Sequence, residues 1–385
     1  MKRLSFVVGL FLCATFSFSQ TKNVVSAWNS LKPEYNELDK AKDFIDKATV
    51  HPKTQVQAKT WYYRGLVYHK LYNTDNNDFK KLHPNPLKEA FAAFIRAEEL
   101  DTKSRYQKDI HYKIGVAGRE FFNLGTKYYD EKKFTEALES FETVIRISQL
   151  PYIDQIDPGA YFNAAIAADQ AGKFVKAEKY YVKSIDLDYG GPDAFHYLAT
   201  IQMTKGDTVS ALDSYKQGIE KYPEDNSFLN IQMVNYHLGR GELVPAKQYA
   251  LTALEQDSVN SSLWFVYGLA TEETDSTEAI YAYKRAIEID PEYFDAYYNI
   301  GSIFYNEGVI LNKDAMNVPL DQQEQYTKIV THRDEILRKA LPFYEKAQII
   351  KDDFPELLNA LKELYYRFEM KEKLEKVKAR IEELN

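Results

Sequence analysis

Cysteine is almost absent from this chain of 385 residues, which contains only Cys13. A chain with one cysteine cannot form an internal disulfide, which excludes the disulfide-stapled class of secreted domains. Glycine and proline are also scarce, with 16 and 13 copies against 30 tyrosines and 22 phenylalanines. Few turn-forming residues and many aromatic ones favour helices packed through aromatic side chains over an all-β fold.

Long apolar runs are missing as well. No segment after the N-terminus approaches the roughly 18 consecutive apolar residues of a membrane-spanning helix. The N-terminus has Lys2 and Arg3, then a shorter apolar run over residues 4–16 and small residues at 17 and 19. This pattern predicts a secretory signal peptide over residues 1–19, and therefore an exported protein that is periplasmic or secreted.

Lipid attachment at Cys13 is the alternative, and it requires a small residue where Leu12 stands. Removal of the signal peptide would remove Lys2 and Arg3 from the 49 basic residues. The remaining 47 basic residues would then face 57 acidic ones, and the net charge would be about −10. An acidic balance argues against nucleic acid and against anionic membrane surfaces as partners.

An internal repeat is the strongest positive signal. The stretches "EALESFETVIRIS", "KAEKYYVKSIDLD", "SALDSYKQGIEKYP" and "AIYAYKRAIEIDP" each place Phe or Tyr four residues after a small residue, on one face of a helix. Marker alanines lie at positions 177, 211, 246 and 279, which are 34, 35 and 33 residues apart. A register held over four copies indicates a repeat array.

A second signature precedes many of these stretches. In "FFNLGTKYYDEKKFTEALESF", Phe121 is followed by Leu124 and Gly125 before Ala137 and Phe141. This pattern predicts two amphipathic helices joined by a short turn, with glycine and alanine where the helices approach most closely. The Asp-Pro step that ends "AIYAYKRAIEIDP" should stop the second helix, because the residue before proline avoids helical geometry.

With these residues in view, the chain resembles the tetratricopeptide repeat family. The resemblance implies an all-α fold, an α-solenoid of stacked helix-turn-helix units, about seven or eight of them. It predicts a continuous array over residues 20–385, which begins with a helix containing Trp28 and "LDKAKDFIDKA" and ends in a helix pair with a charged outer face.

Two insertions interrupt the array, near residues 72–86 and 306–334. The second is helical in pattern, since Asp321 and Glu324 form a capping signature from which a long helix can run to about Ile350. It forms either a helical arm that protrudes from the array or two overlong helices that lie on their neighbours.

Catalytic motifs are not apparent. The seven histidines show no metal-ligand spacing, and there is no phosphate-binding loop and no Gly-x-Ser-x-Gly turn. Asn73, Asp75 and Asn77 have the spacing that begins a calcium loop, but Asp78 and Pro84 stand where glycine and glutamate are required. We therefore expect no catalytic residues, metal or cofactor, and a protein that is not an enzyme.

The resemblance also implies a binding groove lined by the first helix of each unit, at the residue after the leading aromatic. These candidates are Tyr62, Phe122, Phe162, His196, Phe265 and Tyr298, with Ile231 in the weakest unit. Asn123, Asn163 and Asn299 match the family's common asparagine, but the lysines that accompany it in carboxylate-clamping members are missing. The alternative is that these rings cover seams between repeats.

A non-catalytic scaffold of the cell envelope, which binds a partner protein or peptide in this groove, is the function expected from these features. An alternative is a glycan-binding component of an outer-membrane uptake system, since some such proteins use a similar helical scaffold. An enzyme on a helical superhelix would need about 100 residues outside the repeats, which the register does not leave.

Overall fold

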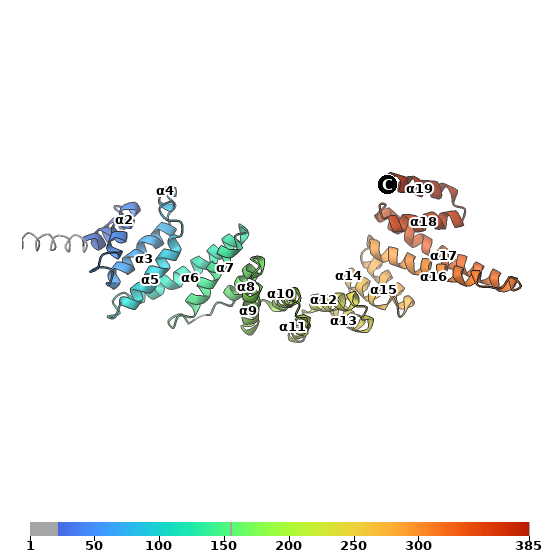
Figure 1. The fold of residues 1–385 in the computed structure, drawn as a ribbon, viewed down its shortest axis with the longest axis horizontal. Coiled ribbons are helices and arrows are strands. Elements are labelled where there is room, and N and C mark those ends of the chain that lie inside the picture. The colour runs from blue at the N-terminus through green and yellow to red at the C-terminus, as the bar shows by residue number, and fades with distance from the viewer. Residues whose placement is uncertain (1–21, 155, 385) are drawn as a thin grey trace, which may run out of the picture. The chain divides into compact units, whose positions relative to one another are not determined.

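The computed structural model describes residues 22–154 and 156–384, and all regular secondary structure in these ranges is helical (Figure 1). The predicted signal peptide, residues 1–19 with Cys13, lies outside the described residues. The described residues form two compact units, one ending at Gly190 and the other beginning at Gly191. The all-α prediction is confirmed, and continuity of the array from one unit to the next stays a prediction. No helix within 22–154 or 156–384 has the length and apolar character needed to cross a membrane.

The first unit begins with a helix over residues 22–30. Its other helices are α2 (Leu38–Thr49), α3 (Ala58–Tyr72), α4 (Asn77–Lys80), α5 (Pro86–Leu100), α6 (Gln107–Asp130), α7 (Phe134–Ser148), α8 (Pro158–Gln170) and α9 (Phe174–Asp186). They pack as pairs, α3 with α5, α6 with α7 and α8 with α9, while α4 is a single turn inside the first insertion. The two helices predicted at the front are both present, because Trp28 lies in the first helix and α2 follows it. Trp28 stacks on Tyr63 of α3.

The second unit continues the pairing. Its helices are α10 (Gly191–Thr204), α11 (Thr208–Lys221), α12 (Ser227–Gly239), α13 (Leu243–Gln256), α14 (Ser261–Thr271), α15 (Ser276–Ile289), α16 (Phe294–Met316), α17 (Gln323–Ile350), α18 (Pro355–Arg367) and α19 (Lys371–Leu384). Each even-numbered helix packs against the helix that follows it. The second insertion lengthens α16 and α17 into a hairpin whose end is exposed, with Met316 at 77% and Leu320 at 100% exposure (Figure 1). The interpretation as a protruding arm is therefore the one that fits.

The predicted start of the long helix is wrong by one residue, because the residue that precedes the helix is Gln322 and not Asp321. Asp321 does not cap it, because Asp321 lies inside a turn closed by a hydrogen bond from the Gln322 N–H to the Pro319 carbonyl. The helix begins at Gln323, and its first turn has no side-chain cap. The predicted end at Ile350 is confirmed, although Pro342 lies inside the helix.

Small residues do lie where paired helices approach. A Cβ atom built on Gly65 would lie 2.4 Å from the Phe94 ring, and one on Gly125 would lie 2.8 Å from the Phe141 ring. In the second unit the corresponding distances are 2.5 Å from Gly268 to the Tyr283 ring and 2.4 Å from Gly301 to the Tyr344 ring. The aromatic ring of the second helix thus occupies the space that a side chain on the first helix would need.

The stretch "AIYAYKRAIEIDP" shows how one helix is specified. Asp275 caps α15, and its carboxylate accepts the N–H groups of Thr277 and Glu278. Ala279, Ala282, Tyr283 and Ala286 form its buried face. Asp290 then adopts an extended conformation (φ −124°, ψ 96°) before Pro291, which ends the helix as predicted.

Candidate functional site

The predicted groove rings of the first unit are half-buried and lie against rings that follow them in the chain. Tyr62 of α3 stacks on Tyr106, with centroids 4.7 Å apart, and its hydroxyl donates to Asp109 Oδ2 at 2.6 Å. Burial, followed by this hydrogen bond, raises the pKa of Tyr62 well above its ordinary value. Tyr62 therefore joins α3 to the start of α6.

The other two rings of this unit meet aromatic side chains of the second helix of their pair. Phe122 of α6 meets Phe141 of α7 edge-to-face at 5.5 Å. Phe162 of α8 meets Tyr181 of α9 at 5.9 Å and also Tyr189, in the segment after α9, at 5.8 Å. Each ring thus covers the line along which two helices of a pair meet.

His196 of α10 occupies the same position in the second unit. Its Nδ1 lies 3.2 Å from the Tyr215 hydroxyl, and its ring meets Phe228 of α12 at 4.8 Å. Burial lowers the pKa of His196, and the nearby Asp193 carboxylate only partly opposes this. The His196 imidazole and the Tyr215 hydroxyl are thus within hydrogen-bonding distance across the α10 and α11 pair.

Phe265 and Tyr298 repeat the arrangement. Phe265 lies between Tyr283 and Tyr293, at 5.5 and 5.1 Å. Tyr298 lies against Tyr344 at 5.9 Å and Phe354 at 5.0 Å. Ile231 of the weakest unit is half-buried against the apolar cluster of α13 and α14. Within each unit these side chains both cover seams and keep a partly exposed surface.

The three asparagines differ from one another. The Asn163 amide donates to the Gly159 carbonyl at 2.8 Å, and the Asn299 amide donates to the Tyr283 hydroxyl at 3.3 Å. Asn123 is exposed on α6. Two of the three predicted contact amides are therefore used within the fold, and Asn123 is the one most open to a partner.

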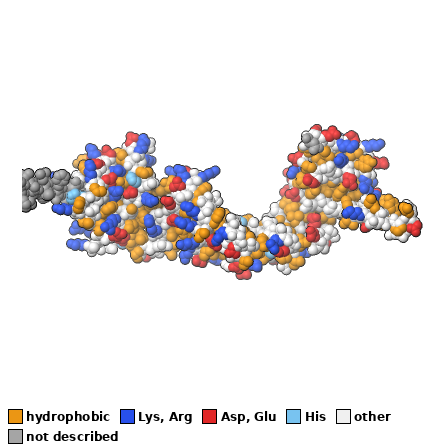
Figure 2. All heavy atoms as spheres, in the orientation of Figure 1, with side chains coloured by type: hydrophobic (Ala, Val, Ile, Leu, Met, Phe, Trp, Pro, Cys, Tyr) orange, Lys and Arg blue, Asp and Glu red, His pale blue; other side chains and the backbone are white. Residues whose placement is uncertain are grey.

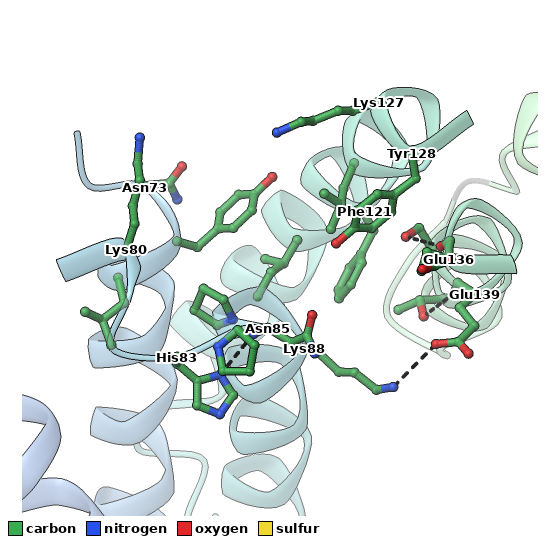
Figure 3. A pocket seen from close by; sticks show the side chains of 18 of the residues that line it. Asn73, Lys80, His83, Asn85, Lys88, Phe121, Lys127, Tyr128, Glu136 and Glu139 are labelled. Atoms are coloured by element: carbon green, nitrogen blue, oxygen red, sulfur yellow. Dashed lines mark hydrogen bonds and ion pairs between the residues drawn. The ribbon is translucent and has the colours of Figure 1, made fainter. Parts of the chain in front are cut away.

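A pocket that the sequence analysis did not anticipate lies in the first unit, beside the first insertion. Its volume is about 660 Å³, and it is bordered by the end of α3, residues 73–85 and parts of α5, α6 and α7. Figure 3 shows Lys80 and Asn73 on the insertion side, and Glu136 and Glu139 opposite them on α7. The insertion was visible in the sequence, but its residues follow no helical period that would have predicted a wall.

Comparisons with known proteins agree with this architecture. A family model described as TPR repeat matches residues 275–308, which span α15 and the first part of α16. The C-terminal part of a TPR repeat-containing protein from Cytophaga hutchinsonii is similar in structure, with a TM-score of 0.52 and 16% identity, over 69% of this chain and 95% of that one. No curated protein matches the sequence significantly.

Two further solved structures match smaller parts of the chain. YrrB, described as a TPR protein with an unusual peptide-binding site, is 18% identical over 46% of this chain and 88% of its own, with a TM-score of 0.35. MamA is 21% identical over 49% of this chain and 94% of its own, with a TM-score of 0.37. The chain contains a match to a TPR repeat at residues 275–308, and its described residues have the all-helical fold of TPR solenoids.

Proposed function

We propose that this chain, with the fold of a TPR solenoid, is a non-catalytic scaffold of the cell envelope that binds a protein or peptide along the first helices of its repeats. The observation that carries the proposal is the recurrence of one half-buried ring, next to the leading aromatic, on six first helices: α3, α6, α8, α10, α14 and α16. Rings held by a neighbouring ring are already ordered, so a partner gains apolar contact without the cost of immobilising them.

Charge supports a protein partner over a polyanion. Basic and acidic side chains are interspersed with hydrophobic ones over the visible face of each unit (Figure 2). Nucleic-acid binding depends on basic side chains gathered along a phosphate backbone, whereas protein interfaces combine an apolar centre with a mixed polar rim. The export part of the proposal rests on the signal-peptide pattern of residues 1–19.

Photocrosslinking in intact cells tests this function. A photoreactive residue replaces Asn123, which is exposed beside Phe122, and a matched control replaces Val175, which is 76% exposed on the second helix α9. We expect one dominant protein adduct from position 123 and none from position 175. Equal capture from both positions, or no protein adduct from 123, would contradict a partner bound on the first helices. The mass of the purified chain also reports whether it begins at Gln20, as export predicts.

Removal of two rings should weaken partner capture. Phe162→Ala and Phe265→Ala together delete one ring in each unit, and each deletion leaves the leading residues Tyr161 and Trp264 in place. We expect at least a tenfold loss of partner in pull-down experiments, because apolar anchors provide much of the interface energy. The helical circular dichroism signal at 25 °C should be unchanged. Loss of the helical signal together with capture would show that the rings are needed only for the fold.

A further inference from the structure

The first insertion forms one wall of this pocket and is ordered by local contacts, although it departs from the repeat pattern. Asn76 caps α4, and its side-chain oxygen accepts the Asp78 and Phe79 N–H groups at 2.8 and 3.5 Å. Further along, His83 Nδ1 accepts the Asn85 N–H at 3.1 Å. The His83 ring also meets the buried Tyr68 ring edge-on at 5.2 Å. The insertion is therefore anchored to α3, and insertions in repeat proteins commonly carry a binding face.

The pocket beside this wall has an apolar floor. Leu71, Leu87 and Phe121 line it and are almost fully buried, at 1%, 1% and 4% exposure. Half-buried Tyr72 and Tyr128 flank this floor. A pocket of about 660 Å³ falls within the range of ligand-binding sites, and it accommodates a short stretch of peptide but not a folded surface.

Some charged groups of the pocket form ion pairs within the described residues, and others do not. Lys88 Nζ lies 3.6 Å from Glu139 Oε2, so these two charges compensate each other (Figure 3). Lys127 has only a distant contact, 3.9 Å to Glu131. Across residues 22–154 and 156–384, no ion pair reaches Lys80, and no hydrogen bond reaches the hydroxyl groups of Tyr72 and Tyr128. The walls formed by the end of α3, the insertion and α6 therefore present several uncommitted donors.

The opposite wall, formed by α7, presents a carboxylate that is unpaired among the described residues, instead of uncommitted hydrogen-bond donors. Glu136 accepts no ion pair from the described residues through its carboxylate, and Figure 3 shows it across the pocket from Lys80. A chain that crosses the pocket from Lys80 to Glu136 would pass over the apolar floor and along α6, which carries Lys127 and Tyr128 (Figure 3). Such an arrangement selects for sequence and direction, because reversing the ligand would place like charges together.

We propose that this pocket binds a short extended peptide segment with an acidic residue at Lys80 and Lys127, an apolar side chain over Phe121 and Leu124, and a basic or amide residue at Glu136. The carboxylate would take the donors that the fold leaves uncommitted. This site is separate from the ring positions on the first helices, so it neither requires nor replaces the function proposed above.

Selection from a phage-displayed library of random heptapeptides on the purified chain tests the proposal. We expect enrichment of peptides with Asp or Glu next to a large apolar residue. A fluorescently labelled peptide from this selection should bind the Lys80→Glu/Lys127→Glu variant at least tenfold more weakly than the unmodified chain in fluorescence polarisation. The matched control, Lys216→Glu/Lys284→Glu, carries the same charge change on exposed lysines of the second unit and should bind within twofold of the unmodified chain.

The possible outcomes separate this pocket from other sites. Selected peptides that bind both variants equally would overturn the proposal, and so would the absence of enrichment. If the selected peptides no longer bind the Phe162→Ala/Phe265→Ala variant but still bind the Lys80→Glu/Lys127→Glu variant, the peptide site is at the rings instead. A glycan array signal abolished by the lysine variant, without peptide enrichment, would replace the peptide by a sugar. Circular dichroism of each variant verifies that the exposed substitutions leave the helices intact.

Discussion

Replacing Gly301 with leucine should destabilise the second unit by about 3 kcal/mol, the cost of overpacking a buried helix crossing. A Cβ atom at Gly301 would lie 2.4, 2.6 and 3.0 Å from three atoms of the Tyr344 ring. That ring is 2% exposed, and its hydroxyl lies 3.2 Å from Ser302 Oγ, so it has no space to swing away. The backbones of α16 and α17 must separate instead.

Thermal melting followed by circular dichroism measures the effect, with an expected fall of roughly 6 to 12 °C. Gly239→Leu is the matched control, since nothing lies within 4 Å of a Cβ atom at Gly239, at the end of α12. Adding Tyr344→Ala to the Gly301→Leu variant should recover part of the loss, because the two changes exchange volume across one contact. An unchanged melting temperature, or an equal fall with Gly239→Leu, would refute the close crossing.

Replacing Arg64 with methionine should cost the first unit about 2 kcal/mol at pH 7. Arg64 bonds Asp46 through Nη1 and Glu89 Oε2 through Nη2 at 3.0 Å, and its guanidinium lies 4.4 Å from the Tyr68 ring centroid. Its side chain is only 16% exposed. Removal of the cation leaves two partly buried carboxylates without their shared partner, and each is about one-third exposed, which moderates the penalty.

The contacts of Asp46 in this cluster make the loss of stability in Arg64→Met depend on pH. Burial alone would raise the pKa of Asp46, but the Lys42 hydrogen bond, the Arg64 charge and the Tyr68 hydroxyl together hold it below its ordinary 3.8. A depressed carboxyl pKa stabilises the fold above the unfolded pKa, and this stabilisation is lost as the pH falls through the folded pKa. The difference between the unmodified chain and Arg64→Met should therefore be complete at pH 7 and shrink below about pH 4.

Urea unfolding of both chains between pH 7 and pH 3 measures this difference. Arg96→Met is the control, because Arg96 is 46% exposed and, among the described residues, forms its ion pair with Glu99 on the same helix. Exposed pairs of this kind contribute about 0 to 1 kcal/mol. A pH-independent loss at Arg64, or an equal loss at Arg96, would show that Arg64 acts through packing of its aliphatic part.

The repeat register could be predicted from sequence because it depends on local spacing. The marker alanines at 177, 211, 246 and 279 are all fully buried. Even the weakest unit, which contains Ile231, follows this rule, since its Met233 and Val234 are also buried. A helix needs only one apolar face at the correct period, and that face can be read directly from the chain.

Contacts between distant segments were harder to predict. Tyr189, Tyr293 and Phe354 lie outside helices, in segments without periodicity, yet they meet three of the predicted groove rings. The sequence placed Phe162, Phe265 and Tyr298 on the correct helices, but it could not show that loop residues half-cover them. The pocket was missed for the same reason, because residues 73–85 become a wall only when α6 and α7 lie opposite.

The contacts between glycines and rings determine which duplications, deletions and recombinations of helices preserve the packing of such a chain. Gly65 and Phe94 belong to one helix pair, as do Gly125 and Phe141, Gly268 and Tyr283, and Gly301 and Tyr344. A breakpoint between α15 and α16 separates no glycine from its ring, whereas one between α16 and α17 exposes Tyr344 and leaves a vacant groove at Gly301. Duplication or deletion of whole pairs therefore preserves every such match, and recombination within a pair does not.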